Sequence, residues 1–210
     1  MNTDSLASVA LGALGLYALV ALLGRSLWQR WRTGSSGWRG VHGSPFSAEW
    51  WAGVLMGVAM LGLVVAPVAV AMAPGTSVSM VRVALGVLLF VAGFGLTLVA
   101  QISMGDSWRI GVQKGESTEL CTAGLFRWSR NPIFTGMLLA GLGIVAWVPW
   151  AAVGWVSLWL GLELQVRVVE EPHLVAMHGS RYVAYARRTG RFWPGLGHGL
   201  PARLGSGGAR

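Results

Sequence analysis

Charged side chains are scarce in this chain of 210 residues: only 11% are Asp, Glu, Lys or Arg, whereas soluble domains average about a quarter. The scarcity is greatest from Asn131 to Leu162, where 32 consecutive residues carry no ionisable side chain. Hydrophobic residues make up 54% of the chain, and 12 residues are Trp. This composition excludes an ordinary soluble domain and predicts a membrane protein.

Cysteine is nearly absent as well. Cys121 is the one cysteine of the sequence, so an internal disulfide framework is excluded. His173 and His178 lie five residues apart without a third partner, which is poor spacing for a metal site. The sequence also lacks a Gly-x-Ser-x-Gly motif, a P-loop and a dinucleotide-binding glycine motif. The chemistry must therefore lie elsewhere.

The formal net charge of +8 does not indicate nucleic acid, because the arginines stand beside apolar runs. Anionic lipid headgroups and membrane topology explain them, so membrane lipids are the expected partners and nucleic acid is not. The first apolar run, Ser5–Gly24, is too long for a typical signal-peptide core. It is also preceded by Asp4 and followed by Arg25, the reverse of a secretory signal, so we interpret it as a retained membrane helix.

The expected fold is all-α: a polytopic membrane protein with about five transmembrane helices and a C-terminal cytoplasmic interfacial helix. A helix of 20 residues, at about 1.5 Å per residue, crosses a hydrocarbon core of roughly 30 Å. The long uncharged run after Asn131 must contain two helices, and Pro149 marks the turn between them. The expected spans are Ser5–Gly24, Trp50–Ala73, Val83–Gln101, Pro132–Ala146 and Trp150–Val169.

After the fifth span we expect one interfacial helix, Glu171–Arg188, with Leu174, Val175, Tyr182 and Tyr185 near one side. The Gly-rich stretch that follows is expected to be disordered. The chain then divides into N-terminal membrane helices at 1–100, a catalytic region of loop, two spans and C-terminal helix at 101–194, and a tail at 195–210.

Basic residues alternate along the expected spans. The loops after the first and third spans and the segment after the fifth are rich in Arg, whereas the opposite ends hold only Arg82. The positive-inside rule then places the N-terminus outside and the C-terminus in the cytoplasm. The Gly-, Ala-, Arg- and Trp-rich composition is typical of a bacterial protein, so we expect a bacterial plasma membrane.

Two charged clusters stand at neighbouring membrane exits. Ser129–Gly136 runs from a basic turn into an apolar span, and Pro132 suits the first turn of a helix that Asn131 is expected to cap. At the end of the next span, Glu163, Arg167, Glu170 and Glu171 are spaced to share one helix face. One reading is a helix end with an internal ion pair; the other is a site in which Glu170 or Glu171 holds an ammonium group and Arg167 an anion. The intervening segment Gln101–Val112 is predicted to be a re-entrant or cytoplasmic loop, in which Trp108 is an interfacial anchor and Arg109 either an anchor or a ligand contact.

The segment Arg130-Asn131-Pro132-Ile133-Phe134-Thr135-Gly136 resembles the Arg-His-Pro-x-Tyr-x-Gly motif of the isoprenylcysteine carboxyl methyltransferase and phospholipid methyltransferase superfamily. Glu170-Glu171-x-x-Leu174, Gly179, Tyr182, Tyr185 and Arg191-Phe192-x-Pro194 resemble its C-terminal signature. The resemblance covers about residues 95–194. It implies an integral membrane enzyme that uses S-adenosylmethionine, bound between the last two spans, the preceding loop and the C-terminal helix.

The resemblance and the charged clusters together suggest site residues. Arg167 and Asn131 are expected to be catalytic. The expected cofactor-binding residues are Gln101, Arg130, Asn131, Pro132, Phe134, Gly136, Glu170, Glu171 and Tyr182. Asn131 stands where the family has His, and Phe134 where it has Tyr, so a titratable base or a phenol at these two positions is not available.

The expected reaction is methyl transfer to a lipophilic, membrane-embedded small molecule or lipid. A carboxylate acceptor needs no base, whereas an amine must first lose a proton, so the missing base favours an oxygen acceptor. Two alternatives stay open: a membrane reductase of related architecture that uses NADPH, which needs phosphate contacts that the Arg-rich tail offers and the acid pair opposes, and a non-catalytic membrane protein.

Overall fold

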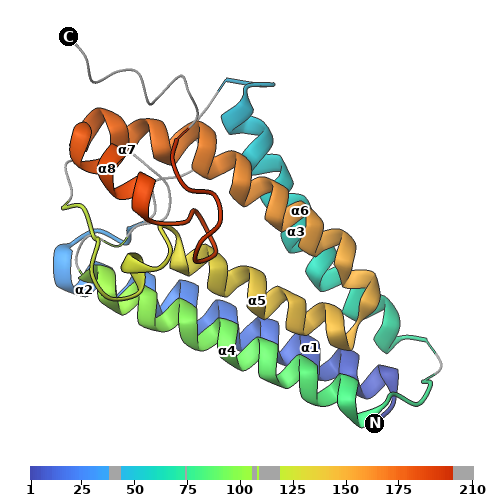
Figure 1. The fold of residues 1–210 in the computed structure, drawn as a ribbon. Helices are drawn as coiled ribbons and strands as arrows, with labels where there is room; N and C mark the ends of the chain where they lie inside the picture. Colours follow the sequence, from blue (N-terminus) through green and yellow to red (C-terminus); the bar gives the residue numbers. More distant parts are fainter. Residues whose placement is uncertain (38–43, 74, 106–107, 109–118, 201–210) are drawn as a thin grey trace.

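The fold is a bundle of long helices (Figure 1), and no β-strand occurs in the part of the chain that the computed structural model describes. The described residues are 1–37, 44–73, 75–105, 108 and 119–200. The all-α prediction is therefore confirmed within these ranges.

The first helix is longer than the sequence suggested. Instead of ending at Gly24, it runs without a break from Thr3 to Thr33, through α1 (Thr3–Tyr17), a π-helical stretch (Ala18–Gly24) and α2 (Arg25–Thr33). The π-helical stretch holds the carbonyl of Ala21, which accepts a hydrogen bond from Gln101. Gly34, at φ 76°, then ends the helix in the left-handed conformation that glycine adopts readily.

The second and third spans begin slightly earlier than expected, because serine side chains cap them. Ser47 accepts a hydrogen bond from the backbone of Trp50 at the start of α3 (Ala48–Ala71), and Ser79 accepts one from Arg82 at the start of α4 (Met80–Met104). The prediction that the loop begins at Gln101 is wrong, since α4 continues to Met104. Of that predicted loop, 106–107 and 109–112, including Arg109, lie outside the described residues.

The predicted hairpin after Asn131 is confirmed. α5 spans Pro132–Trp147, a 3-10 turn follows at Pro149–Ala151, and α6 spans Ala152–Gln165. Val148 separates the two helices with an extended backbone, and Pro149 opens the turn as predicted. α5 and α6 are therefore antiparallel neighbours.

The helical segment predicted at Glu171–Arg188 is present, but its start and its continuity differ from the prediction. A π-helical stretch (Val166–Glu170) joins α6 directly to α7 (Glu171–His178), so that one helix runs from Pro149 to His178. Gly179, at φ 53°, then ends α7 and lets α8 (Ser180–Arg188) turn away. Tyr182 and Tyr185 of α8 are buried against Leu174 and Val175 of α7 instead of facing lipid.

The helices form two layers, with α1, α4 and α5 in one and α3 and α6 in the other, and the layers spread apart towards α7 and α8 (Figure 1). Glycines allow the closest approaches: a Cβ on Gly93 of α4 would lie 2.2 Å from the backbone nitrogen of Ala140 in α5. Similarly, a Cβ on Gly62 of α3 would lie 2.9 Å from the Cα of Gly154 in α6. Each of these helix pairs is thus fixed by backbone contact.

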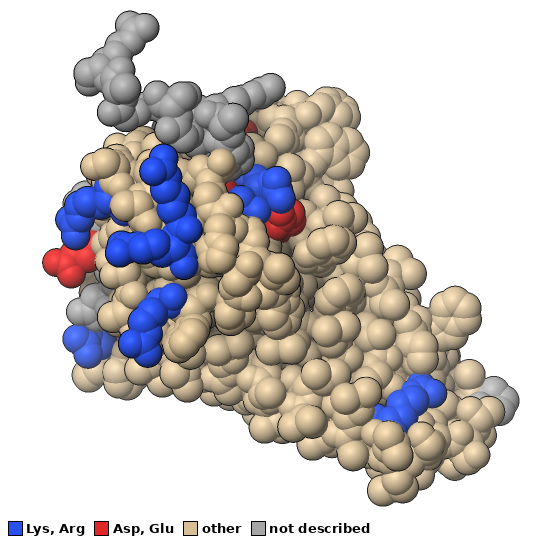
Figure 2. All heavy atoms as spheres, viewed as in Figure 1, with Lys and Arg blue, Asp and Glu red and all other residues tan. Residues whose placement is uncertain are grey.

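Four of the described helices are long and apolar enough to cross a membrane: Thr3–Thr33, Ala48–Ala71, Met80–Met104 and Pro149–His178. α5 is apolar but has only 16 residues, about 24 Å of helix. Basic side chains gather over the end of the molecule that holds α7 and α8, and most of the surface along the helices carries neither sign of charge (Figure 2). The chain is an integral membrane protein, and its charges lie mainly at one end.

Candidate active site

The start of α5 is tied to the segment that follows α8. We call residues 189–200 the strap. The backbone N–H of Arg130 donates to Gly190 at 2.8 Å, and that of Asn131 donates to Arg191 at 3.1 Å. Thr135 donates its hydroxyl to the carbonyl of Phe192 at 2.6 Å. The two motifs recognised in the sequence thus form one structural unit, although they are about 60 residues apart.

The expectation that the Asn131 side chain caps α5 is wrong. Asn131 occupies the N-cap position, but its side chain makes no capping hydrogen bond within the described structure. Its amide donates instead to the carbonyl of Arg191 at 3.0 Å. Pro132 occupies the first turn as predicted. The Asn131 side chain therefore bonds to the strap instead of capping the helix.

A buried ion cluster lies beneath this junction. Glu171 is 0% exposed, and its Oε1 accepts hydrogen bonds from Arg130 Nη2 at 2.6 Å and Arg191 Nε at 2.9 Å, while its Oε2 accepts one from Arg191 Nη2 at 3.1 Å. Arg130 also donates to the carbonyls of Ala186 and Thr189. We call Arg130, Glu171 and Arg191 the buried clamp, because they join α5, α7 and the strap.

Two tyrosines of α8 pack beside the clamp. Burial raises the pKa of Tyr182, and the nearby Glu171 carboxylate raises it further. Burial also raises the pKa of Tyr185, whose hydroxyl donates to the carbonyl of Phe126 at 2.5 Å. Both phenols therefore stay neutral at physiological pH.

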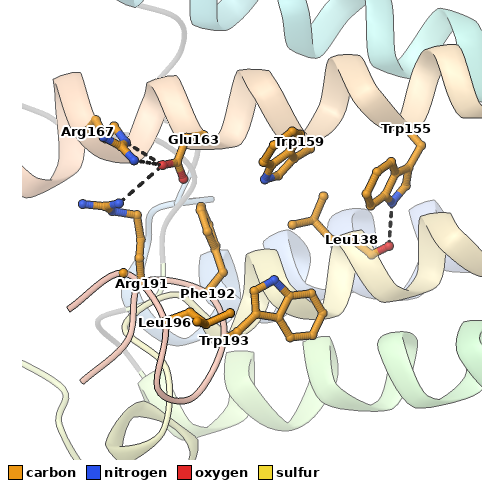
Figure 3. Close-up of a pocket in the computed structure, with 10 residues that line it drawn as sticks. Leu138, Trp155, Trp159, Glu163, Arg167, Arg191, Phe192, Trp193 and Leu196 are labelled. Carbon is orange, nitrogen blue, oxygen red and sulfur yellow. Dashed lines mark hydrogen bonds and ion pairs between the residues drawn. The ribbon is translucent and has the colours of Figure 1, made fainter. Parts of the chain in front are cut away.

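A groove of about 410 Å³ lies between α5, the α6 helix and the strap (Figure 3). We call it the lateral groove. Its walls are Leu138 of α5; Trp155, Trp159, Glu163 and Arg167 of the Pro149–His178 helix; and Arg191, Phe192, Trp193, Leu196 and Gly197 of the strap. This volume falls in the usual range for a small-molecule site.

One end of the lateral groove is charged. Glu163 pairs with Arg167, one turn along the helix, and accepts a 3.3 Å hydrogen bond from Arg191 Nη1. The Arg191 side chain is only 9% exposed, whereas that of Arg167 is 50% exposed. Burial lowers the pKa of Arg191, but its hydrogen bond and ion pair with Glu171 outweigh this effect and raise the pKa overall. Arg191 thus belongs to both the groove and the buried clamp.

The other end of the groove is aromatic. Trp155 and Trp159 extend from α6 towards α5, with Leu138 and Trp193 on the opposite side (Figure 3). Trp155 donates its indole N–H to the carbonyl of Leu138 at 2.8 Å, which fixes the ring across the space between the two helices. The groove is therefore amphipathic along its length.

The predicted site residues lie in three different places. Arg130, Asn131, Glu171 and Tyr182 gather at the junction of α5, α7, α8 and the strap, and Arg167 reaches the groove. The amide of Gln101 instead donates to the carbonyl of Ala21 in the first helix at 2.9 Å.

Four of the remaining predicted residues have other surroundings. Pro132 and Gly136 are buried, and a Cβ on Gly136 would lie 2.4 Å from the Thr97 hydroxyl of α4. Phe134 packs against the hydrophobic core, and Glu170 is half-buried at the end of the second π-helical stretch.

Other groove residues were not predicted as site residues, namely Trp155, Trp159, Glu163, Arg191, Phe192 and Trp193. A signal for four groove residues was present, because Trp155, Trp159, Glu163 and Arg167 recur every fourth residue and so lie along one side of a helix. Arg191 and Phe192 belong to the C-terminal signature. Nothing local in the sequence indicated that Trp193 would face α5.

The expected tail also needs correction. Residues 195–200 belong to the strap and are held by hydrogen bonds from Gly199 N to Ala186 O and from Arg130 to Gly199 O. The prediction of disorder is therefore wrong for these six residues. The remainder of the predicted tail, 201–210, lies outside the described residues.

Two comparisons place this architecture among known proteins. The profile of a family described as phospholipid methyltransferase matches residues 81–181. A solved structure of the eukaryotic intramembrane Ras methyltransferase ICMT (isoprenylcysteine carboxyl methyltransferase) has a similar fold, with a TM-score of 0.65 and 17% sequence identity, over 95% of this chain and 69% of that chain. No curated protein sequence matches the chain significantly. The resemblance inferred from the motifs is thus confirmed, and the findings support a membrane methyltransferase.

Proposed function

We propose that the protein transfers a methyl group from S-adenosylmethionine to an oxygen of a lipophilic acceptor that enters the lateral groove from the membrane. The observation that carries the proposal is the groove itself, which has ionic groups at one end and tryptophans at the other. A hydrocarbon-bearing substrate with a polar head needs both. The family match and the ICMT-like fold support the same reaction class.

The charged end fits the cofactor chemically. S-adenosylmethionine ends in an amino acid, whose ammonium requires an acceptor and whose carboxylate requires a donor. Glu163 supplies a carboxylate and Arg191 a guanidinium within one hydrogen-bonded group, and Phe192 and Trp193 add aromatic surface for a ring. When bound there, the cofactor supplies a methyl group on a positively charged sulfur, which leaves as a neutral thioether.

The buried clamp is a positioning device in this proposal. Both oxygens of Glu171 already accept hydrogen bonds from guanidinium groups, and its side chain has no exposed surface. We therefore assign the cofactor's ammonium to Glu163 in place of Glu171. The clamp fixes Arg191, which in turn presents its Nη1 to Glu163. Holding a donor within a few tenths of an ångström is a large part of what such a transfer requires.

Arg167 is the group best placed for the head of the acceptor. It is the more exposed of the two groove arginines, and a guanidinium binds a carboxylate in a bidentate geometry. Among the groove residues, the titratable side chains are Glu163, Arg167 and Arg191; both arginines pair with Oε1 of Glu163, and this carboxylate is assigned to the cofactor's ammonium. A carboxylate acceptor is already ionised at neutral pH and requires no base. An oxygen acceptor is therefore favoured over an amine.

The proposed orientation puts the charged end of the groove at the cytoplasmic face, with the N-terminus outside. It rests on the Arg-rich ends of the chain. Reporter fusions after Gly75 and Pro149 should then read outside, and a fusion after Gly199 should read inside. The opposite readings would place the groove on the wrong side for a cytoplasmic cofactor.

The decisive experiment is a calorimetric titration of the detergent-solubilised protein with S-adenosylmethionine and, in parallel, with NADPH. We expect binding of the first and none of the second. Binding of NADPH alone would replace the methyltransferase by a reductase, and binding of neither would support a non-catalytic protein. Mass spectrometry of membrane lipids after overexpression should then show a product heavier by one CH₂ group.

A further inference from the structure

Trp155 is the tryptophan of α6 that lies farther from the charged end of the lateral groove. Trp155, Trp159 and Glu163 follow one another at four-residue intervals on α6, so Trp155 lies about 12 Å from Glu163 along the helix axis. Figure 3 shows Trp155 as the labelled groove residue farthest from Arg167. The apolar part of the groove is thus bounded by charge at one end and by this indole at the other.

The indole of Trp155 is held in place from two sides. Its N–H donates to the carbonyl of Leu138 on the opposite helix at 2.8 Å. Below the ring lies Gly141 of α5, where a Cβ would come within 2.8 Å of the indole Cδ1. The ring therefore rests against the α5 backbone and closes the end of the groove. By contrast, Trp159 is 43% exposed and forms part of an open side.

We propose that Trp155 is a specificity-determining residue that limits the length of the acceptor's hydrocarbon chain. This inference rests on the proposed function, since it assumes that the acceptor head lies at Arg167. A chain that starts beside Glu163, with which Arg167 is paired, can extend about 12 Å along α6 before it meets the indole. A longer chain must bend out through the open side into lipid.

This limit on chain length is set by packing contacts in the groove and not by the hydrophobic effect. The chain leaves a lipid or detergent environment that is as apolar as the groove, so the hydrophobic effect does not favour either location. Contacts with Trp159, Leu138 and Trp193 favour a chain that fills the groove, and contact with Trp155 opposes one that overfills it. Acceptors of intermediate length should therefore bind best.

The test uses saturated fatty acids from octanoate to stearate as probes, because they share a carboxylate head and differ only in length. Binding to the full-length protein in detergent is measured by native mass spectrometry, and methyl transfer from S-adenosylmethionine is measured separately. Wild-type protein should show an optimum length. Trp155→Ala should shift the optimum to longer chains, with the ratio of long-chain to short-chain affinity rising about tenfold.

Three further variants make the result specific. Trp155→Phe keeps a ring and should shift the optimum in the same direction by less, and it decides the matter if Trp155→Ala does not fold. Trp159→Ala should weaken binding at all lengths alike, because it removes a side wall. Trp150→Ala changes a tryptophan that is 77% exposed and outside the groove, and it should leave the profile unchanged.

The outcomes separate this inference from the proposed function. If folded Trp155 variants keep the wild-type length profile, or if no fatty acid binds at any length, the role of Trp155 is overturned. If the profile shifts as expected but no probe or membrane lipid is ever methylated, the groove measures chain length while the proposed reaction fails.

Discussion

Glu163 and Glu171 are two acids eight residues apart on one continuous helix, yet they occupy opposite environments. Glu163 has a side chain 24% exposed and lines the lateral groove, whereas the side chain of Glu171 is fully buried in the clamp. The π-helical stretch Val166–Glu170 lies between them and changes the helical register. The acid pair recognised in the sequence thus contains a buried structural member, and an acid that lines the groove lies two turns earlier.

The largest expected effect comes from removing the buried charge. Glu171→Gln removes the carboxylate that pairs with the buried Arg130 and leaves Arg191 with Glu163 as its partner, which costs about 3–5 kcal/mol. Thermal unfolding in detergent should show a midpoint lower by roughly 10 °C. The control is Glu119→Gln, which changes an exposed acid. An unaltered midpoint together with lost cofactor binding would return Glu171 to the ligand site.

The groove acid should behave in the opposite way. Glu163→Gln removes the proposed partner of the cofactor's ammonium, so calorimetry should show cofactor affinity reduced tenfold to a hundredfold, or about 1.5–3 kcal/mol. Its effect on the unfolding midpoint should be much smaller than that of Glu171→Gln, because Glu163 is partly solvated. Equal affinity in wild type and variant would remove Glu163 from the cofactor site.

A smaller change is expected from Arg167→Lys. The substitution keeps the charge and replaces a two-pronged donor by a point charge, so the acceptor KM should rise about tenfold while cofactor affinity stays the same. Steady-state kinetics with the best fatty-acid probe measures this, and Arg181→Lys, an exposed position on α8, is the matched control. Loss of cofactor binding alone would assign Arg167 to the other ligand.

The smallest effect concerns pH and is confined to alkaline solution. Burial raises the pKa values of Tyr182 and Tyr185 above the ordinary value of 10.0, so the folded state favours the neutral phenols. Their contribution to stability is complete below pH 10 and declines as the pH rises above it. Unfolding midpoints measured across this range should fall less steeply for Tyr182→Phe than for wild type. A decline of equal slope would show that Tyr182 does not titrate in the unfolding transition.

Much of the fold could be predicted because hydropathy and helix signals are local. Uncharged runs marked all the apolar helices, and Pro149 marked the hairpin turn. Helix ends were less predictable: a serine cap moved the starts of α3 and α4, and the extension of α6 into α7 depends on packing against the strap and α8. Where local signals are weak, the ends of the helices depend on contacts with segments that are distant in sequence.

Hydropathy and local motifs specify the helical membrane architecture, the two motif segments and the clustering of charge at one end. Tertiary packing settles which charges are buried and which line the groove. The reason is physical: the local sequence does not distinguish a buried glutamate from an exposed one. The role of each carboxylate depends on whether basic side chains from elsewhere in the chain neutralise it. Arg130 and Arg191 neutralise Glu171 from segments about 40 residues before it and 20 after it, and no local pattern specifies that meeting.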